Sequence, residues 1–395
     1  MPVNYQQVQQ QVRDQVKLAP ARQKQQRERL DRAHVLLERH ADDLAYLQDK
    51  VAHAAARDKG LRCAVPLTEA LNQAHAAVAP SVYPVLLAAD GSQINPNRHD
   101  AIEFGLVNVG VIRMQPAQAT TPRETTSSEL FLYQSPEDDT GPLTEEYVAL
   151  LRDFKERKEL ADLAAAEPGT VLTLTDGPLE LFREPKGDPR FDALFEKYLG
   201  VMEYLASMNT VTAGYVDKPG ADLVVRLLEL TLYPDEELQK AGKDHQLGGV
   251  RDIDLFRNTL NPGERTAIFA IQSPSAEKFK QRLEGQMALH FFYLNVGRPE
   301  KPGLVRVELP AWVSRQAELV ELLQATLLQQ CRQMGTHPYP YALHRAHEVA
   351  LVSFQEKQQL QVMIEAELRR AGEEPGEQSN KQSHKDLEGR KRYGA

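Results

Sequence analysis

Two short stretches of the chain decide its fold: residues 84–92, PVLLAADGS, and residues 171–178, VLTLTDGP. In each of them, an apolar run of strand length ends in an aspartate followed by a glycine. The two aspartates are Asp90 and Asp176. If both runs are strands of one sheet, their carboxylates can meet at one edge, where like charges are costly to bury unless a cation or a proton compensates them. The pair is therefore a candidate metal site.

The composition is that of a globular protein without a membrane segment. Of 395 residues, 42% are hydrophobic and 26% are charged, which is ordinary for such proteins. No apolar stretch approaches the roughly 20 residues of a membrane-spanning helix, and the amino terminus lacks the features of a secretion signal. Only Cys63 and Cys331 are present, which fits a reducing compartment and excludes a cysteine-built metal site. We therefore expect a cytoplasmic protein without membrane contact.

The charge balance bears on the class of partner. The formal net charge is −9, which is unfavourable for a protein that holds nucleic acid through general electrostatics. Contact with DNA would therefore need local Lys/Arg patches, metal ions or a partner protein.

The amino-terminal part, residues 1–78, is predicted to be a helical region. Small or apolar residues recur there in steps of three and four from Leu30 to Ala54, with charged residues on either side. Such a heptad-like stripe is typical of a helix that packs on its own domain. A contact with a partner protein or with a second subunit is the alternative.

The remainder, residues 79–371, is predicted to form one domain with an inserted loop-rich segment near 234–263, followed by a disordered tail at 372–395. The predicted strands lie at 82–89, 101–114, 129–133, 171–176, 210–215, 266–272, 289–296 and 303–309. The predicted helices lie at 144–166, 188–208, 219–230, 312–334 and 341–370.

Three strands, a helix and a fourth strand, in this order, are typical of the ribonuclease H-like fold, an α/β architecture with a mixed sheet flanked by helices. That fold carries one acid on the first strand, one on the first helix and one on the fourth strand. Asp90 and Asp176 take the first and third of these positions, and the predicted helix offers Glu156 and Glu159 on roughly one face. Three carboxylates suit two Mg²⁺ or Mn²⁺ ions about 4 Å apart on a phosphodiester.

The chain also resembles a known family, the NurA nucleases. The resemblance lies in four motifs, which keep the family's order over roughly residues 80–355: ADGS at 89–92, DGPL at 176–179, VELPAWV at 307–313 and YPYALHRAH at 339–347. It implies a manganese-dependent DNA nuclease of the 5′-to-3′ exonuclease and single-strand endonuclease type. It also implies that the protein resects DNA ends with a HerA-like hexameric ATPase translocase and forms a homodimer.

The resemblance implies roles for single residues. Asp90, Asp176 and one helix acid would bind the metal, and Glu159 suits the family's spacing to Asp176 better than the alternative, Glu156. The same resemblance makes Tyr339 a residue that orients water or phosphate.

It also makes His347 a metal ligand, with His344 one helical turn away as the alternative. A neutral imidazole would give the site some preference for Mn²⁺, although Mg²⁺ would also serve.

One basic residue is expected to contact nucleic acid, and two other functions are possible for the chain. Lys218 precedes a proline that is predicted to open a helix, and a helix start suits a phosphate contact, so Lys218 is the predicted nucleic-acid ligand. The main alternative to a nuclease is a catalytically silent scaffold that binds nucleic acid or the translocase. An aspartate-nucleophile phosphotransferase is less favoured, because such enzymes typically carry a second acid close after the first, whereas residues 91–95 read GSQIN.

Overall fold

The computed structural model describes residues 3–97, 99–100, 102–116, 118, 120–132, 144–181 and 189–373. The predicted tail at 372–395 therefore lies outside the described residues from 374 onwards. The chain divides into two compact units, each built from two segments of the sequence. None of the helices in the described ranges has both the length and the apolar character needed to cross a membrane.

The first unit comprises Met1–Ala79 and Tyr215–Leu328. Its helices are α1 (Tyr5–Lys17), α2 (Ala19–Arg39), α3 (Leu44–Arg57), α6 (Leu223–Leu230), η1 (Asp235–Glu237), α7 (Leu238–Ala241), α8 (Asp252–Phe256), α9 (Pro274–Lys280), η2 (Leu283–Gly285) and α10 (Ala311–Ser314). Its strands β1 (Cys63–Pro66), β7 (Phe269–Gln272), β8 (Leu289–Asn295) and β9 (Leu304–Pro310) pair antiparallel in this order. Helix α11 (Ala317–Gln333) begins in this unit and ends in the second.

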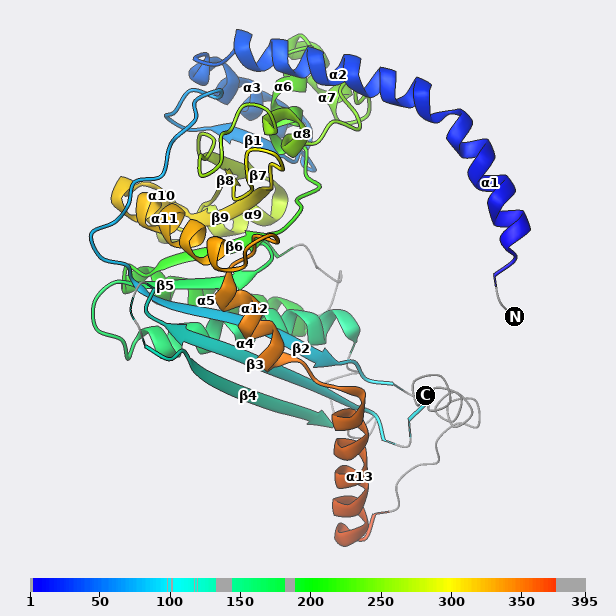
Figure 1. Ribbon diagram of the computed structural model, residues 1–395, viewed down its shortest axis with the longest axis vertical. Coiled ribbons are helices and arrows are strands. Elements are labelled where there is room, and N and C mark those ends of the chain that lie inside the picture. Colours follow the sequence, from blue (N-terminus) through cyan, green and yellow to red (C-terminus); the bar gives the residue numbers. More distant parts are fainter. Residues whose placement is uncertain are drawn as a thin grey trace. The chain divides into compact units, whose positions relative to one another are not determined.

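The second unit comprises Pro80–Gly214 and Gln329–Ala395. Its elements are β2 (Val85–Ile94), β3 (Phe104–Met114), β4 (Arg123–Leu132), α4 (Glu145–Ala164), β5 (Val171–Asp176), α5 (Pro189–Ser207), most of β6 (Val211–Val216), α12 (Tyr341–Ala350) and α13 (Phe354–Ala371). The strand order is β6-β5-β2-β3-β4, with β2, β3 and β4 antiparallel and β5 parallel to β2. This mixed sheet flanked by helices is the ribonuclease H-like arrangement that the sequence predicts (Figure 1).

The division into units differs from the predicted domains. Segment 215–328 does not continue the domain that begins at residue 79; it groups with the amino-terminal helices instead. The physical reason is tertiary pairing between segments far apart in sequence: β1 pairs with β7, and α2 and α3 pack on α6. The predicted apolar stripe is buried within this unit, at Ala33, Leu37, Leu47, Val51 and Ala54. The stripe therefore packs on its own domain, as the favoured reading of the sequence had it.

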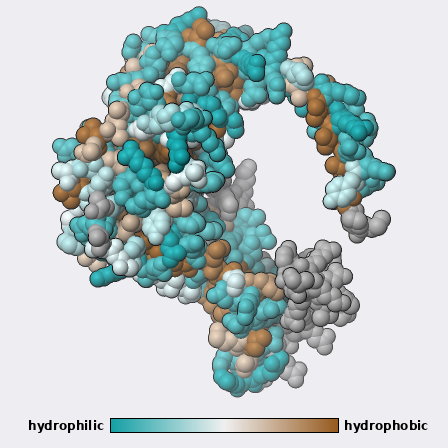
Figure 2. Space-filling model, in the orientation of Figure 1, coloured by the Kyte–Doolittle hydropathy of each residue, from teal (hydrophilic) through white to brown (hydrophobic). Residues whose placement is uncertain are grey.

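Helix α1 has no buried residue, unlike α2 and α3. The side chains of Tyr5, Val8, Val12 and Val16 are all exposed. Figure 2 shows apolar surface along this helix.

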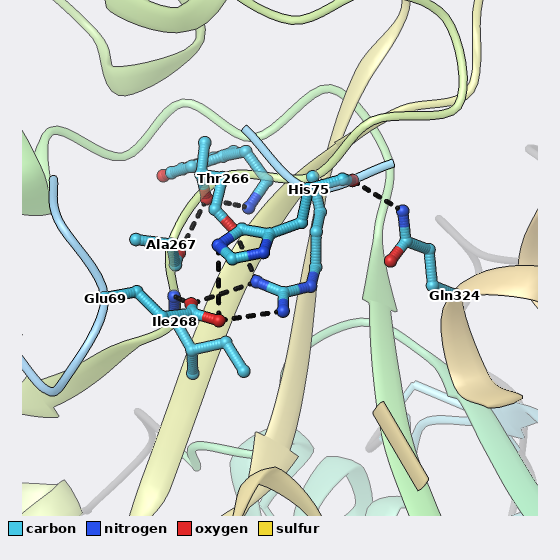
Figure 3. Close-up of polar contacts among 8 residues, drawn as sticks. Glu69, His75, Thr266, Ala267, Ile268 and Gln324 are labelled. Atoms are coloured by element: carbon cyan, nitrogen blue, oxygen red, sulfur yellow. Dashed lines mark hydrogen bonds and ion pairs between the residues drawn. The ribbon is translucent and has the colours of Figure 1, made fainter. Parts of the chain in front are cut away.

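A carboxylate–guanidinium contact joins Glu69, which follows β1, to the segment that precedes β7 (Figure 3). Glu69 accepts two hydrogen bonds from the Arg265 guanidinium, at 3.0 and 2.9 Å, and a third from the backbone N–H of Ile268 at 2.8 Å. Burial acts to raise the pKa of Glu69, but these bonds outweigh it and hold the pKa below its usual value. The backbone carbonyl of His75 accepts a further bond from Gln324.

In the second unit, both faces of the sheet are covered, and this explains the uninterrupted apolar run of β2. Residues Val85 to Ala89 are all buried, as is typical of a strand with helices on both sides. Helix α4 begins where the sequence predicts, because the Thr144 hydroxyl accepts a hydrogen bond from Tyr147 N–H. Helix α12 also packs on β2 and β3.

Several boundaries differ from the prediction. The predicted helix at 341–370 is two helices, because the chain leaves the helical path after Ala350 and Ser353 then caps α13 in a capping box with Glu356. The predicted loop region at 234–263 contains η1, α7 and α8, and the sequence prediction missed β1 and α9. Helix α6 begins at Leu223 rather than at Pro219.

Candidate functional site

Asp90 lies inside a strand rather than at its end. Strand β2 continues to Ile94, so the prediction that the strand stops at Ala89 is wrong. What stops at Ala89 is the parallel ladder with β5, whose last pair is Ala89 with Thr175. Asp90 and Asp176 are the residues that follow this pair, and they continue two neighbouring parallel strands. The backbone therefore brings the two predicted acids to adjacent positions, as the apolar runs indicated.

His347 contacts Asp90. Its Nδ1 atom lies 2.7 Å from Asp90 Oδ2, across from α12 to β2. The His347 side chain is 57% exposed and that of Asp90 only 16%, so the pair has one solvent-facing side. The alternative histidine, His344, instead lies 3.6 Å from Glu348 on its own helix.

The helix carboxylate close to this strand is Glu156, whose Oε1 atom would lie 2.6 Å from a Cβ atom on Gly91, the residue after Asp90. Its side chain is buried, and burial raises the pKa of Glu156 well above its usual value; the negative charges of Asp153 and Asp90 add to the rise. Glu159 is half-buried and lies next to Lys158. The pKa of Lys158 is raised chiefly by its hydrogen bond to Asp162 and in smaller part by the charge of Glu159. The structure thus favours the alternative helix acid, and the metal-binding role of either residue stays a prediction.

Two arginines lie beside these acids. On the sequence alone, Arg157 is one of several basic residues near the motifs, most of which are expected to be solvated, and Arg152 is not singled out. Arg152 donates to Asp153 at 2.8 Å and lies 3.3 Å from Glu156. Burial works against its charge, but the neighbouring carboxylates, Asp153 first, raise the pKa of Arg152. Arg157 is buried and donates to the Thr175 hydroxyl in β5.

A charged run such as that from Arg152 to Glu159 is expected from the sequence to be mostly solvated, but Glu156 and Arg157 are buried. A signal was present in the sequence. Glu156 precedes Leu160 by four positions and Arg157 precedes Ala161 by four, so both share a helix face with residues that are buried.

A small cavity of about 200 Å³ connects the helix acid with the second strand acid. It is lined by residues of α4, by the turn that follows β5 and by Tyr198 of α5. The charged residues that line it are Arg152, Asp153, Glu156, Arg157, Asp176 and Glu180. The cavity therefore presents carboxylates and guanidinium groups to the same volume, next to the strand pair that carries Asp90.

Three glycines let the surrounding elements approach the sheet closely. A Cβ atom on Gly91 would lie 2.6 Å from Glu156 Oε1, and one on Gly110 would lie 2.7 Å from the carbonyl oxygen of Ala346 in α12. A Cβ atom on Gly214 in β6 would lie 2.5 Å from the carbonyl oxygen of Gly177, directly after Asp176. Real Cβ atoms essentially never come within 3.0 Å of another heavy atom. A side chain at any of these glycines would therefore displace Glu156, α12 or the turn after Asp176.

Tyr339 and Lys218 are the remaining predicted site residues. Tyr339 is half-buried and comes just before Pro340, which caps the start of α12. Lys218 is exposed, belongs to the first unit and has a left-handed backbone with φ of 48°. It does not open a helix, because α6 starts at Leu223. The roles proposed for both stay predictions.

The donor set agrees in kind with a hard divalent cation. It offers carboxylate oxygens from two adjacent strands and one helix, together with an imidazole nitrogen. The like charges around Glu156 are also an arrangement that a bound cation would relieve. In the part of the chain that the structure describes, however, no three His, Cys, Asp or Glu side chains are gathered closely enough to hold a metal ion. In this structure, the positive charge beside Glu156 comes from Arg152, and the hydrogen-bonding partner of Asp90 is His347.

Comparison with known proteins gives one family. A family model described as the NurA domain matches residues 84–352. The crystal structure of the NurA nuclease from Sulfolobus solfataricus is similar with a TM-score of 0.49 and 12% identity, over 75% of this chain and 88% of that chain. No curated protein matches the chain.

Two further solved structures are less similar. Drosophila Piwi gives a TM-score of 0.29 at 13% identity, over 67% of this chain and 29% of that chain. LC9-RNase H1, a type 1 RNase H with the type 2 active-site motif, gives 0.22 at 14% identity, over 52% and 85%. All three TM-scores are below 0.5, so the family model is the comparison on which the assignment rests.

Proposed function

Because the chain belongs to the NurA family of nucleases, we propose that it is a metal-dependent deoxyribonuclease whose active site lies around Asp90. The observation that supports this most directly is the contact between Asp90 and His347, two residues far apart in sequence, beside the strand that ends in Asp176. All three residues fall within the range that the family model matches.

Asp90, Asp176, His347 and one carboxylate of α4 would hold Mn²⁺, or Mg²⁺ in its place. Two such ions, when bound, would activate water and stabilise the oxygen that leaves during phosphodiester hydrolysis. On the protein side, both oxygens of Asp90 are oriented by neighbours: Oδ2 lies 2.7 Å from His347 Nδ1, and Oδ1 accepts a hydrogen bond from the Gly91 backbone N–H at 2.8 Å. Each oxygen keeps a further lone pair that would be available to a cation. Tyr339 would orient water or a phosphate from the start of α12, and Lys218 would contact the DNA backbone.

The acidic charge of the chain favours delivery of DNA by a partner. A net charge of −9 gives little general attraction for a polyanion. A HerA-like hexameric ATPase that threads the duplex would remove the need to capture DNA from solution. We therefore propose a cytoplasmic homodimer that resects DNA ends with such a translocase. Gel filtration of the mixed proteins at moderate salt tests the partnership, and failure to co-elute would count against it.

The nuclease proposal is tested with fluorescently labelled single- and double-stranded oligonucleotides in Mn²⁺, in Mg²⁺ and in EDTA. The full chain should cleave DNA with Mn²⁺ and lose activity in EDTA. Asp90→Asn and Asp176→Asn should each lower cleavage more than about 100-fold, because each removes an anionic oxygen ligand. Circular dichroism and DNA-binding anisotropy verify that these variants remain folded and still bind DNA.

The helix acid is identified with a matched pair of variants, Glu156→Gln and Glu159→Gln. Both make the same isosteric change on α4. We expect the first to abolish cleavage and to weaken Mn²⁺ binding in a calorimetric titration, because the Glu156 carboxylate lies beside Gly91, the residue after Asp90. The second should be close to wild type; the opposite pattern would reinstate Glu159. A wild-type chain that binds DNA without cutting it under any metal condition would instead indicate the silent scaffold.

A further inference from the structure

The carboxyl end of α12 is held by side chains of the sheet. The carbonyl oxygen of Ala350, the last residue of the helix, accepts hydrogen bonds from Ser92 Oγ at 2.5 Å and from Asn108 Nδ2 at 2.8 Å. The Oδ1 atom of Asn108 accepts a hydrogen bond from Ser128 Oγ at 2.6 Å. This bond orients the amide so that its NH₂ group points towards the helix. Carbonyls in a last helical turn have no partner within the helix, so here the sheet supplies one.

These side chains form one row across three strands. Ser92 of β2 is paired with Asn108 of β3, and Asn108 with Ser128 of β4. The pair of Asp90 with Gly110 lies two residues further along. Since side chains alternate between faces with a period of two, Asp90 and the polar row face the same helix.

The neighbouring row allows α12 to lie directly on the backbone of the sheet. A Cβ atom on Gly110 would come within 2.7 Å of both the Ala346 carbonyl oxygen and the Ala350 nitrogen, and within 3.1 Å of the Val349 carbonyl carbon. All three are backbone atoms, which no change of rotamer can move aside. Any residue larger than glycine would therefore displace the helix.

We propose that Ser92, Asn108 and Gly110 are positioning residues that fix α12 on the sheet and thereby set His347 against Asp90. His347 lies three residues, about one helical turn, before Ala350. The hydrogen bonds at the carboxyl end of α12 fix the position of the helix along the strands. The close contact at Gly110 fixes the distance of the helix from the sheet. The inference rests on the proposed function, in which Asp90 and His347 belong to the active site.

The first test measures cleavage by Asn108→Ala and Gly110→Ala. Asn108→Ala should lower kcat about 10-fold and Gly110→Ala about 100-fold with KM unchanged, since a misplacement of about 1 Å at a catalytic group has effects of this size. The control is Ser207→Ala. Like Asn108→Ala, it removes a side-chain hydrogen bond to a backbone carbonyl in the last turn of a helix, here from Ser207 Oγ to the Tyr204 carbonyl of α5 at 2.7 Å, and it should leave kcat unchanged.

A double-mutant cycle separates positioning from general damage. In a chain that already carries His347→Ala, Asn108→Ala should have no further effect on kcat, because the residue it positions is absent. An equal fall in kcat in both backgrounds would overturn the inference. Should Gly110→Ala fail to fold, the Asn108→Ala cycle decides alone.

A second readout does not depend on cleavage. In protein labelled with ¹⁵N-histidine, the ring signal of His347, assigned with His347→Gln, reports its contact with Asp90. Asn108→Ala and Gly110→Ala should shift this signal towards its position in Asp90→Asn, and Ser207→Ala should not. If the wild-type chain cuts no nucleic acid, the proposed function fails while this readout still tests the positioning. An unchanged His347 signal in both variants would refute the positioning even if activity falls.

Discussion

Replacing Gly214 with alanine is a direct test of how the sheet places Asp176. The new Cβ atom would lie 2.5 Å from the Gly177 carbonyl oxygen and 3.1 Å from the Leu179 nitrogen. Ordinary contacts begin at 3.4 Å, so the turn after β5 must move by about 0.9 Å, the difference between 3.4 and 2.5 Å. Both obstructing atoms belong to the backbone, so the turn itself has to shift. Asp176 precedes Gly177 and would shift with it.

The expected cost has two parts. Forcing an extra methyl group into a packed site typically destabilises a protein by about 1–3 kcal/mol. A displacement of almost 1 Å at a catalytic carboxylate should lower kcat about 100-fold. The two parts are separated by measuring urea denaturation together with oligonucleotide cleavage at a temperature where the variant is fully folded.

Gly200→Ala is the matched control. It makes the same change in the same unit, but a Cβ atom at this helical position meets nothing within 4 Å. It should keep full activity and gain up to about 1 kcal/mol of stability, because alanine is the better helix former. If Gly214→Ala also cleaves DNA at the wild-type rate, then the position of this turn does not govern catalysis, and the argument from close packing fails.

Two further predictions concern stability of the first unit. Burial raises the pKa of Asp252 to about 7. Between about pH 4 and 7, the folded chain therefore binds a proton that the unfolded chain has lost. The free energy of unfolding should fall as pH rises through this window, by up to about 4 kcal/mol. Asp252→Asn should lack this slope in urea titrations at pH 5 and pH 7.5, and equal slopes in both proteins would contradict the assignment. Glu69→Gln weakens the two hydrogen bonds from Arg265 and should lower the free energy of unfolding by about 2 kcal/mol in the same assay. A change near zero would mean that this contact contributes nothing to stability.

The sequence was sufficient for features that depend on local pattern. The apolar runs before Asp90 and Asp176 predicted two buried strands, and the structure pairs them in parallel. Thr144 and the acids after it predicted the start of α4. Patterns of this kind survive because capping and burial act on the residues that form the element itself.

Features that depend on tertiary pairing could not be predicted. Gly91, Ser92 and Gln93 favour a turn by composition, yet they extend β2 because β3 pairs with them along their whole length. The buried charges of Glu156 and Arg157 were hidden in a run of charged residues, since burial there depends on which face of α4 meets the sheet. Similarly, nothing local indicates that residues 215–328 join the amino-terminal segment.

The second unit is completed only when the chain returns from the first. Its strand acids come from residues 80–214, but α12 and His347 come from the segment that starts at Gln329. During synthesis, the ribosome therefore releases both aspartates long before the histidine that contacts one of them. A chain that ends within the first unit therefore carries Asp90 and Asp176 but lacks His347, and it cannot form the contact between Asp90 and His347.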